Sequence, residues 1–187
     1  TVYTPIVELV VNSIQAIESA QRKNGVIAIR VDRSDQLEID GGRSEVRGFE
    51  VEDNGVGFTD GNRQSFDTLY SDQKIGEGGK GFGRFTCLKY FEDVQVDSVF
   101  RSPDGAKRRT FSMGKGQDII VDEVLADAPR AQLRTIVRLI ELRANKSVDK
   151  KLSTIARNLA ERLLPHFLVE DQVCPDIILS EKDGSDQ

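Results

Sequence analysis

Glu8 and Asn12 stand one helical turn apart in a segment whose other side chains are mostly apolar. With Gln15 and Ser19 they follow the spacing of a single helical face. A carboxylate and a carboxamide on one face of an otherwise buried helix need a polar group to contact. An amide oxygen is a suitable ligand for magnesium beside phosphate oxygens, and a carboxylate one turn away can deprotonate a water. The alternative is a narrow solvent-facing stripe, which would not need asparagine, a weak helix former.

Asp53 ends a segment in which strand alternation puts Phe49, Val51 and Asp53 on one face. Because Phe49 and Val51 should face the core, Asp53 is predicted to point inward. A buried carboxylate needs hydrogen-bond donors, and the exocyclic amine of adenine is such a donor. Gly55 and Gly57 would let the backbone approach a flat ligand closely. The alternative is a plain Asp-Asn-Gly turn, which needs neither the second glycine nor an acid on the core face.

A glycine-rich segment over residues 76–84 precedes an expected helix. Backbone amides in such a loop, with the positive end of the helix, form an anion site, and Lys80 and Arg84 add charge for phosphates. The segment is not a Walker loop, because glycine rather than Ser or Thr follows Lys80. It matches the dinucleotide-binding glycine pattern, but residues 71–74 are not the strand which that pattern requires. The candidate phosphate-binding residues are Gly76, Gly78, Gly79, Lys80, Gly81, Phe82 and Gly83.

Turn signals and apolar periodicity indicate the elements that position these residues. Thr4 and Pro5 are predicted to begin a helix that ends near Arg22. Residues 54–83 are expected to form a long binding loop or lid. The other expected elements are strands over residues 26–33, 46–52, 94–100, 108–113, 119–124 and 135–142, and helices over residues 85–91 and 148–164. This order predicts an α+β fold, a two-layer sandwich whose mixed, mostly antiparallel sheet is covered on one face by helices.

Length and composition narrow the class of protein. The 187 residues fit one domain, expected over residues 1–179 with a polar tail over 180–187, and Thr1 at the start suggests a piece of a longer protein. A net charge of −5 argues against a domain that wraps nucleic acid. Two separate cysteines and a single histidine give no zinc pattern. No apolar run approaches the roughly 20 residues that span a bilayer, so we expect a cytoplasmic protein without membrane contact.

In this order and spacing, the three motifs resemble the GHKL superfamily of ATPases, whose nucleotide-binding domain has the Bergerat fold. Its members include the gyrase B subunit, the heat-shock ninety chaperones, MutL-type mismatch-repair proteins and sensor histidine kinases. The resemblance is carried by residues 8–16, 53–57 and 75–84, and Thr135 is similar to the family's threonine that opens a late strand. The glycine-rich segment looks more like that of chaperone-like bacterial ATPases than that of gyrase or the kinases.

The resemblance implies a role for each residue. Asn12 would ligate Mg²⁺, and Glu8 would be the general base for the water that attacks the γ-phosphate of ATP. Asp53 would hold the adenine amine, with Thr135 supporting it through water. Gly57 would line the adenine slot, and the glycines of residues 76–83 would wrap the phosphates. One departure is Arg134, which stands where the family often has glycine before the threonine.

The resemblance also implies three candidate functions. The first is magnesium-dependent ATP binding with slow hydrolysis to ADP and phosphate, where closure of the lid controls a neighbouring domain or a nucleotide-dependent homodimer. Several relatives take a basic γ-phosphate contact from a following domain. The hydrolysis is expected to be slow because the 187 residues include no such domain. The alternative is the ATP-binding domain of a histidine protein kinase, for which His166 is the one candidate acceptor. The third is a nucleotide sensor without turnover, against which Glu8 argues.

Overall fold

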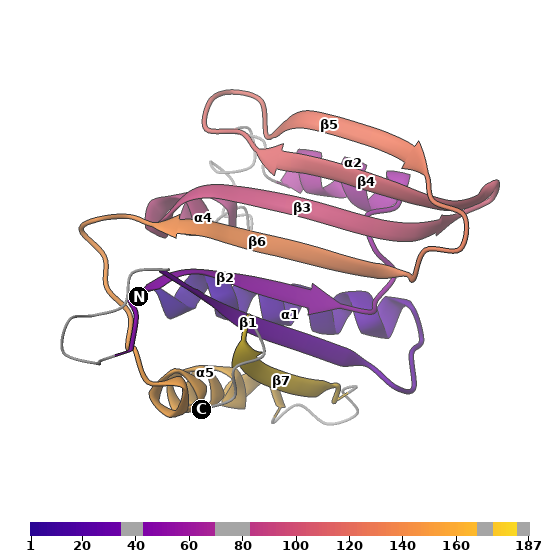
Figure 1. Ribbon diagram of the computed structural model, residues 1–187. Helices are drawn as coiled ribbons and strands as arrows, with labels where there is room; N and C mark the ends of the chain where they lie inside the picture. Colours follow the sequence, from indigo (N-terminus) through magenta and orange to yellow (C-terminus); the bar gives the residue numbers. More distant parts are fainter. Residues whose placement is uncertain (35–42, 70–82, 168–173, 183–187) are drawn as a thin grey trace.

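A seven-stranded sheet forms the framework of the computed structural model, which describes residues 1–34, 43–69, 83–167 and 174–182 (Figure 1). The strand order is β5-β4-β3-β6-β2-β1-β7. Neighbouring strands are antiparallel except for β1 and β7, which are parallel. The sheet is therefore mixed and mostly antiparallel, as predicted. The strands are β1 (Val26–Arg33), β2 (Val46–Asp53), β3 (Phe91–Ser102), β4 (Gly105–Met113), β5 (Ile120–Asp127), β6 (Arg134–Leu142) and β7 (Asp176–Glu181).

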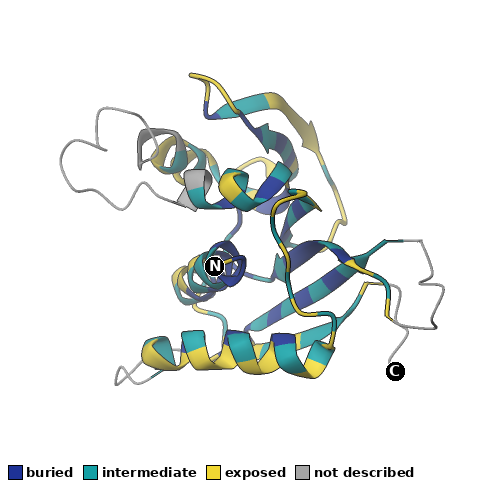
Figure 2. Cartoon of the chain, turned by 90° about the vertical axis from the view of Figure 1, so that its left-hand side faces the viewer, coloured by how far each residue is buried: buried dark blue, intermediate teal, exposed yellow. Residues whose placement is uncertain are grey.

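The described helices cover one face of this sheet (Figures 1 and 2). Helix α1 packs on β2, α4 packs on β3, and α5 packs on α1 and β7. This arrangement is the two-layer α+β sandwich expected from the sequence. Within the described residues, no helix is long and apolar enough to cross a membrane. The helices are α1 (Tyr3–Ser19), α2 (Asp60–Leu69), α4 (Gly83–Tyr90) and α5 (Leu152–Phe167).

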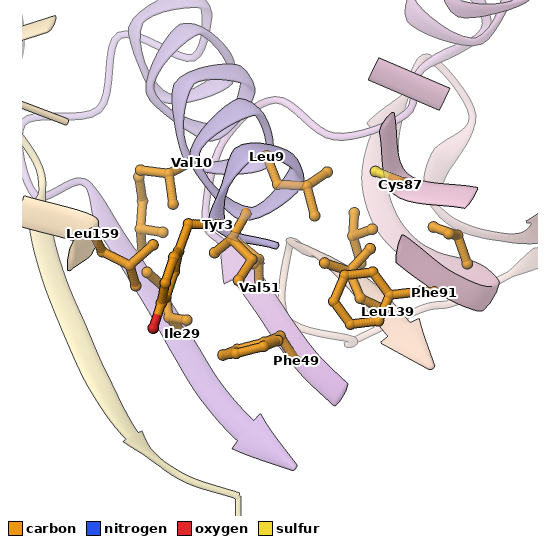
Figure 3. Close-up of a cluster of buried hydrophobic side chains, with 14 of the residues drawn as sticks. Tyr3, Leu9, Val10, Ile29, Phe49, Val51, Cys87, Phe91, Leu139 and Leu159 are labelled. Carbon is orange, nitrogen blue, oxygen red and sulfur yellow. The ribbon is translucent and has the colours of Figure 1, made fainter. Parts of the chain in front are cut away.

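The core lies between α1, α5 and the inward faces of the central strands (Figure 3). Phe49 of β2 and Phe91 of β3 meet edge to face, with ring centroids 6.2 Å apart. Ile6, Val10 and Ile17 of α1 are almost completely buried above these strands. Because the apolar residues of α1 occupy most of its circumference, the helix is held on several sides, and its polar stripe is the part left for other contacts.

The ends of α1 differ from the predicted ones. The helix begins at Tyr3, so Thr4 is not its N-cap, and the N-cap residue Val2 makes no side-chain capping bond. It ends at Ser19, three residues before the expected position. Gln21 follows in the left-handed region with φ 52°, and its N–H donates to the carbonyl of Glu18. A non-glycine residue in this conformation gives no sequence signal, because glycine usually fills the position.

Two elements were not predicted. Helix α2 lies inside the segment expected to be a loop, so that expectation was wrong for residues 60–69. Its composition is polar, and Phe66 is the residue through which it contacts Phe58 and Phe111. Strand β7 is only six residues long, and its Ser180 and Glu181 extend into the segment expected as a polar tail. Both elements are stabilised by contacts with distant segments, which the periodicity of a short segment does not reveal.

Candidate functional site

A cavity of about 310 Å³ opens beside α1, above the inward face of β2, β6, β3 and β4. Five of the residues predicted from the sequence line it together, although they come from separate parts of the chain. The helix α1, the turn after β2, and the helices α2 and α4 form its walls, while Val96, Met113 and Val137 form an apolar part of its lining. The five predicted residues are Glu8, Asn12, Asp53, Gly57 and Thr135.

Asp53 is the buried acid of this cavity, with 6% of its surface exposed. The Ser13 hydroxyl donates to Oδ2 at 3.0 Å, and the Gly55 N–H donates to Oδ1 at 2.8 Å. Burial raises the pKa of Asp53 to about 6, although both hydrogen bonds act in the opposite direction. Each carboxylate oxygen can accept a further hydrogen bond. The inward orientation predicted from strand alternation is confirmed, and the carboxylate can receive a donor from a ligand in the cavity.

The two glycines after Asp53 serve different contacts. A Cβ atom on Gly55 would lie 2.6 Å from the carbonyl carbon of Ala16, so this glycine allows the turn to approach α1. Gly55 does not line the cavity, although it was predicted to contact the ligand. Gly57 has φ 79°, and a Cβ atom there would lie 2.9 Å from both Phe100 Cβ and Ser98 Oγ. Gly57 therefore lines the cavity in a conformation and a space that favour glycine.

The same turn is anchored on both flanks. The Asn54 side chain accepts a hydrogen bond from the Val26 N–H at 3.0 Å and donates to the Asn24 carbonyl at 2.9 Å. The Val56 N–H donates to the Ala16 carbonyl at 3.0 Å. These bonds join β2, the start of β1 and α1. They explain why the Asp-Asn-Gly sequence forms a rigid corner that fixes the Asp53 carboxylate, since each polar group of Asn54 is used structurally.

Thr135 continues the polar row that Asp53 begins. The register pairs Asp53 with Thr135 across β2 and β6, and Thr135 with Ser98 across β6 and β3. The Thr135 and Ser98 hydroxyl oxygens are 2.8 Å apart, and the Phe58 N–H donates to Ser98 Oγ at 2.9 Å. The sequence reasoning missed Ser98 and Ser13. Alternation along residues 94–100 would have placed Ser98 on the inward face with Val96.

Glu8 and Asn12 form the other end of the candidate site, on the face of α1 that borders the cavity. The Oε2 atom of Glu8 is buried and has no hydrogen-bond partner among the described residues. Burial also raises the pKa of Glu8. A buried acceptor without a donor is uncommon in proteins and fits a residue that meets a water or ligand in the cavity. Asn12 is exposed, so its side-chain oxygen is accessible to a bound cation or phosphate.

Most of the predicted phosphate-binding segment lies outside the described residues. The residues concerned are Gly76, Gly78, Gly79, Lys80, Gly81 and Phe82. Gly83 is the first residue of α4, and Cys87 of the same helix lines the cavity. The cavity is thus bordered by the helix that follows the glycine-rich segment. His166, the candidate phosphate acceptor, lies in the last turn of α5 and does not line the cavity.

The residues present can be tested for magnesium. Within the described part of the chain, no three His, Cys, Asp or Glu side chains cluster as a metal site. Magnesium commonly keeps several waters and binds through one or two protein ligands together with substrate phosphates. Asn12 on the cavity rim fits such a site, in which the nucleotide and waters supply the remaining ligands.

Comparison with known proteins gives two findings. A family model described as "Histidine kinase-, DNA gyrase B-, and HSP90-like ATPase" matches residues 2–123. Among solved structures, the chain is similar to the Aquifex aeolicus MutL ATPase domain complexed with ADP, with 15% identity and a TM-score of 0.49. The similarity covers 95% of this chain and 59% of that one, so the chain spans about three-fifths of that structure's length. No curated protein matches the sequence.

Proposed function

This chain belongs to the family of histidine kinase-, DNA gyrase B- and HSP90-like ATPases, and we propose that it binds ATP with Mg²⁺ and hydrolyses it slowly to ADP and phosphate. The family match includes Glu8, Asn12, Asp53 and Gly57, and Thr135 lies beyond it. The observation that carries the proposal is the buried Asp53 carboxylate, which borders a cavity with apolar walls and has acceptor capacity left for a ligand.

The adenine ring would occupy the part of the cavity next to Asp53. Val96, Met113 and Val137 supply apolar surface there, which suits a flat aromatic ring. Asp53 would accept a hydrogen bond from the exocyclic amine, with Thr135 beside it in the register. Gly57 would let the backbone lie close to the ring, because it has no side chain. Gly55 supports this arrangement indirectly, through its contact with α1.

The phosphates would extend toward Glu8 and Asn12. Asn12 would hold Mg²⁺ through its amide oxygen, and the bound ion would neutralise charge on the phosphate oxygens. Residues 76–83 would supply backbone N–H groups for the phosphates, with Lys80 adding a positive charge. Gly83, at the start of α4, would place the positive end of that helix near the same anion.

Glu8 would act as the general base. Its raised pKa and its unpartnered Oε2 atom make it a proton acceptor that is not already occupied by the protein. It would take a proton from a water as the water oxygen bonds to the γ-phosphorus. The bond from the γ-phosphorus to the bridging oxygen would break, leaving ADP and phosphate. This role would raise the rate of hydrolysis without contributing much to ATP binding.

The wider role is that of a switch in a larger protein. ATP binding would close the glycine-rich lid of residues 76–83, and hydrolysis would open it again. Closure of the lid would control a neighbouring domain or a nucleotide-dependent homodimer.

We place this protein in the cytoplasm, consistent with its two cysteines being unpaired. His166 does not line the cavity, so we propose hydrolysis, and phosphotransfer to a histidine would need an acceptor from another domain of the parent chain.

Calorimetric titration tests the proposal. The protein is titrated with ATP in the presence of Mg²⁺, and again as the Asp53→Asn variant. The control is Asp104→Asn, which makes the same chemical change at a side chain that is 85% exposed in the β3–β4 turn. We expect binding to the wild type and the control, and loss of binding in Asp53→Asn. Equal affinity for all three proteins would remove Asp53 from the adenine site.

A further inference from the structure

Ser98 is fully buried and joins three parts of the site, yet it is not among the residues expected to bind ATP. We propose that Ser98 fixes the direction of the Thr135 hydroxyl and thereby makes the cavity select adenine over guanine. This inference rests on the proposed nucleotide site and adds a specificity-determining residue to it. Ser98 acts through Thr135, so it is a positioning residue.

The geometry places three polar side chains in one row across three strands. Asp53, Thr135 and Ser98 lie on neighbouring strands in consecutive register pairs, all on the inward face. Their exposed fractions are 6%, 5% and 0%. Thr135 and Asp53 line the cavity, whereas Ser98 lies beneath, on the far side of Thr135. The row therefore ends in a residue that the ligand does not reach.

The hydrogen bonds of Ser98 have a preferred direction. Its oxygen accepts from the Phe58 N–H at 2.9 Å, a bond that can run only one way. The 2.8 Å contact with Thr135 could run either way from geometry alone. If Ser98 accepted there too, its own O–H would lack an acceptor among the described hydrogen bonds, in a fully buried place. Leaving a buried donor unpaired is unfavourable, so Ser98 donates to Thr135.

The direction of the hydrogen bond between Ser98 and Thr135 decides whether Thr135 presents a donor or an acceptor to the cavity. Since Thr135 Oγ1 receives the Ser98 proton, its own proton points away from Ser98 and is available to the cavity. We take Thr135 to meet the base directly, and not through water as the family resemblance implies, because it lines the cavity beside Asp53. The cavity then presents an acceptor, the Asp53 carboxylate, next to a donor, the Thr135 hydroxyl. Adenine carries the complementary pair, an amine donor beside a ring-nitrogen acceptor. Guanine carries a carbonyl acceptor and a ring N–H donor in the same order, so both of its groups would face groups of their own kind.

A hydroxyl free to turn would lose this discrimination. Without Ser98, Thr135 could either donate to the base or accept from it, at the cost of one torsional rotation. A site whose buried polar groups are fixed rejects the mismatched ligand strongly, because mismatched groups are left unpaired. Fixing the hydroxyl therefore contributes selectivity even though Ser98 makes no contact with the nucleotide.

The test compares ADP and GDP on the same proteins. Calorimetry in Mg²⁺ gives the ratio of the two dissociation constants for the wild type, Ser98→Ala, Ser98→Thr and the control Ser112→Ala. Ser112 lies on the opposite, outward face of β4, and its partner across the strands is Gln95. We expect the ratio to fall by about tenfold or more in Ser98→Ala, since about 1.4 kcal/mol corresponds to tenfold. Ser98→Thr, which keeps the hydroxyl, should retain the wild-type ratio, as should the control.

Two results would overturn the inference, and a third would overturn the proposed function on which it rests. Weaker binding of both nucleotides by the same factor in Ser98→Ala would mean that Ser98 only supports the Phe58 backbone. Equal binding of ADP and GDP to the wild type would refute the selectivity while leaving nucleotide binding intact. Binding of neither nucleotide to the wild type would instead overturn the proposed function. Thermal unfolding of each variant identifies loss of folding. If Ser98→Ala does not fold, the same ratio is measured in Ser98→Cys, whose thiol is a weak hydrogen-bond donor, and it should also fall there.

Discussion

The Ser13 hydroxyl donates a 3.0 Å hydrogen bond to Asp53 Oδ2, joining the middle of α1 to the end of β2. Ser13 directly follows Asn12 in the sequence, so this bond fixes the helix face that carries Asn12 and Glu8 relative to the buried carboxylate. Together with the bond from Val56 to Ala16, it holds two motifs separated by some forty residues in one geometry. One side-chain hydrogen bond and one backbone hydrogen bond thus join the two ends of the proposed ATP site.

Asp53→Asn should increase the stability of the nucleotide-free protein at neutral and alkaline pH. Burial raises the pKa of Asp53 from 3.8 to about 6, so the folded state binds its proton more tightly than the unfolded state does. This contribution to stability is complete below about pH 4 and is lost as the pH rises through about 6. Asparagine avoids the buried charge, and the gain at pH 8 should be about 1–3 kcal/mol.

Urea unfolding at pH 5 and pH 8 measures this effect. The difference in free energy of unfolding between Asp53→Asn and the wild type should be larger at pH 8 than at pH 5. Asp104→Asn, at an exposed turn, should show no such pH dependence. A destabilised Asp53→Asn at pH 8 would mean that the Ser13 and Gly55 hydrogen bonds outweigh the cost of burying the charge.

Glu8→Gln should keep ATP binding and lose hydrolysis. The amide has nearly the same size as the carboxylate but cannot accept the proton of the attacking water. General-base catalysis contributes roughly 10²–10⁴-fold, so steady-state phosphate release should fall at least about 100-fold. The control is Glu18→Gln, on the same helix and not lining the cavity. Unchanged turnover in Glu8→Gln would remove Glu8 from the reaction.

Gly57→Ala should weaken both nucleotide binding and folding. The residue has φ 79°, and the new Cβ would lie 2.9 Å from Phe100 Cβ and Ser98 Oγ. Backbone strain of this kind costs of order 1–3 kcal/mol. Gly61→Ala is the matched control, since that position in α2 has open space around a built Cβ. In thermal unfolding and ADP titration, Gly61→Ala should resemble or exceed the wild type. Equal melting temperatures and equal ADP affinities for the two variants would contradict the close packing at Gly57.

Arg109→Ala should destabilise the wall of the cavity. This buried guanidinium donates to the Phe58 carbonyl at 2.6 Å and pairs with Asp60 at the start of α2 and with Glu123 of β5. Removing one partner of a buried ion pair costs about 3–5 kcal/mol, and the exposure of Asp60 places this case at or below the lower end. ADP affinity should fall as well, because Phe58 borders the cavity.

Lys107→Ala provides the comparison for Arg109. It lies on the same strand and the same face, and the ion pair that it makes within the described residues, to Asp104, is long at 4.0 Å and exposed. Its unfolding free energy should therefore stay within about 0.5 kcal/mol of the wild type. Chemical denaturation measures the free energy of unfolding of both variants. If Arg109→Ala and Lys107→Ala lose similarly small amounts of it, the Arg109 contacts contribute little to stability.

Much of the site could be predicted because each motif follows a local rule. Strand alternation placed Asp53 inward, and helical spacing put Glu8 and Asn12 on one face. Strand alternation could also have placed Ser98 on the inward face. Its small polar side chain, between Val96 and Phe100, gives no signal of a binding role in the sequence. The hydrogen bond between Ser13 and Asp53 could not be predicted, because it depends on how α1 is seated on β2.

Elements held mainly by long-range contacts were the ones missed. Helix α2 has few apolar residues, and the Thr59 hydroxyl accepts from the Asn62 N–H at 3.2 Å near its start. Its docking depends on Phe66 and on the pairing of Arg63 with Glu123, sixty residues away. Strand β7 depends on a parallel register with β1. The contacts that stabilise α2 and β7 come from distant segments, so the local periodicity of each element could not reveal them.

A crystal structure of the protein with Mg²⁺ and a non-hydrolysable ATP analogue would test the central claim most directly. The account predicts that the exocyclic amine of adenine lies about 2.7–3.2 Å from an Asp53 carboxylate oxygen, with the phosphates directed toward Asn12. A nucleotide bound elsewhere, for instance in the surface hollow lined by Arg22, Lys23 and Arg101, would contradict it. So would an adenine ring in the cavity whose amine makes no hydrogen bond with Asp53.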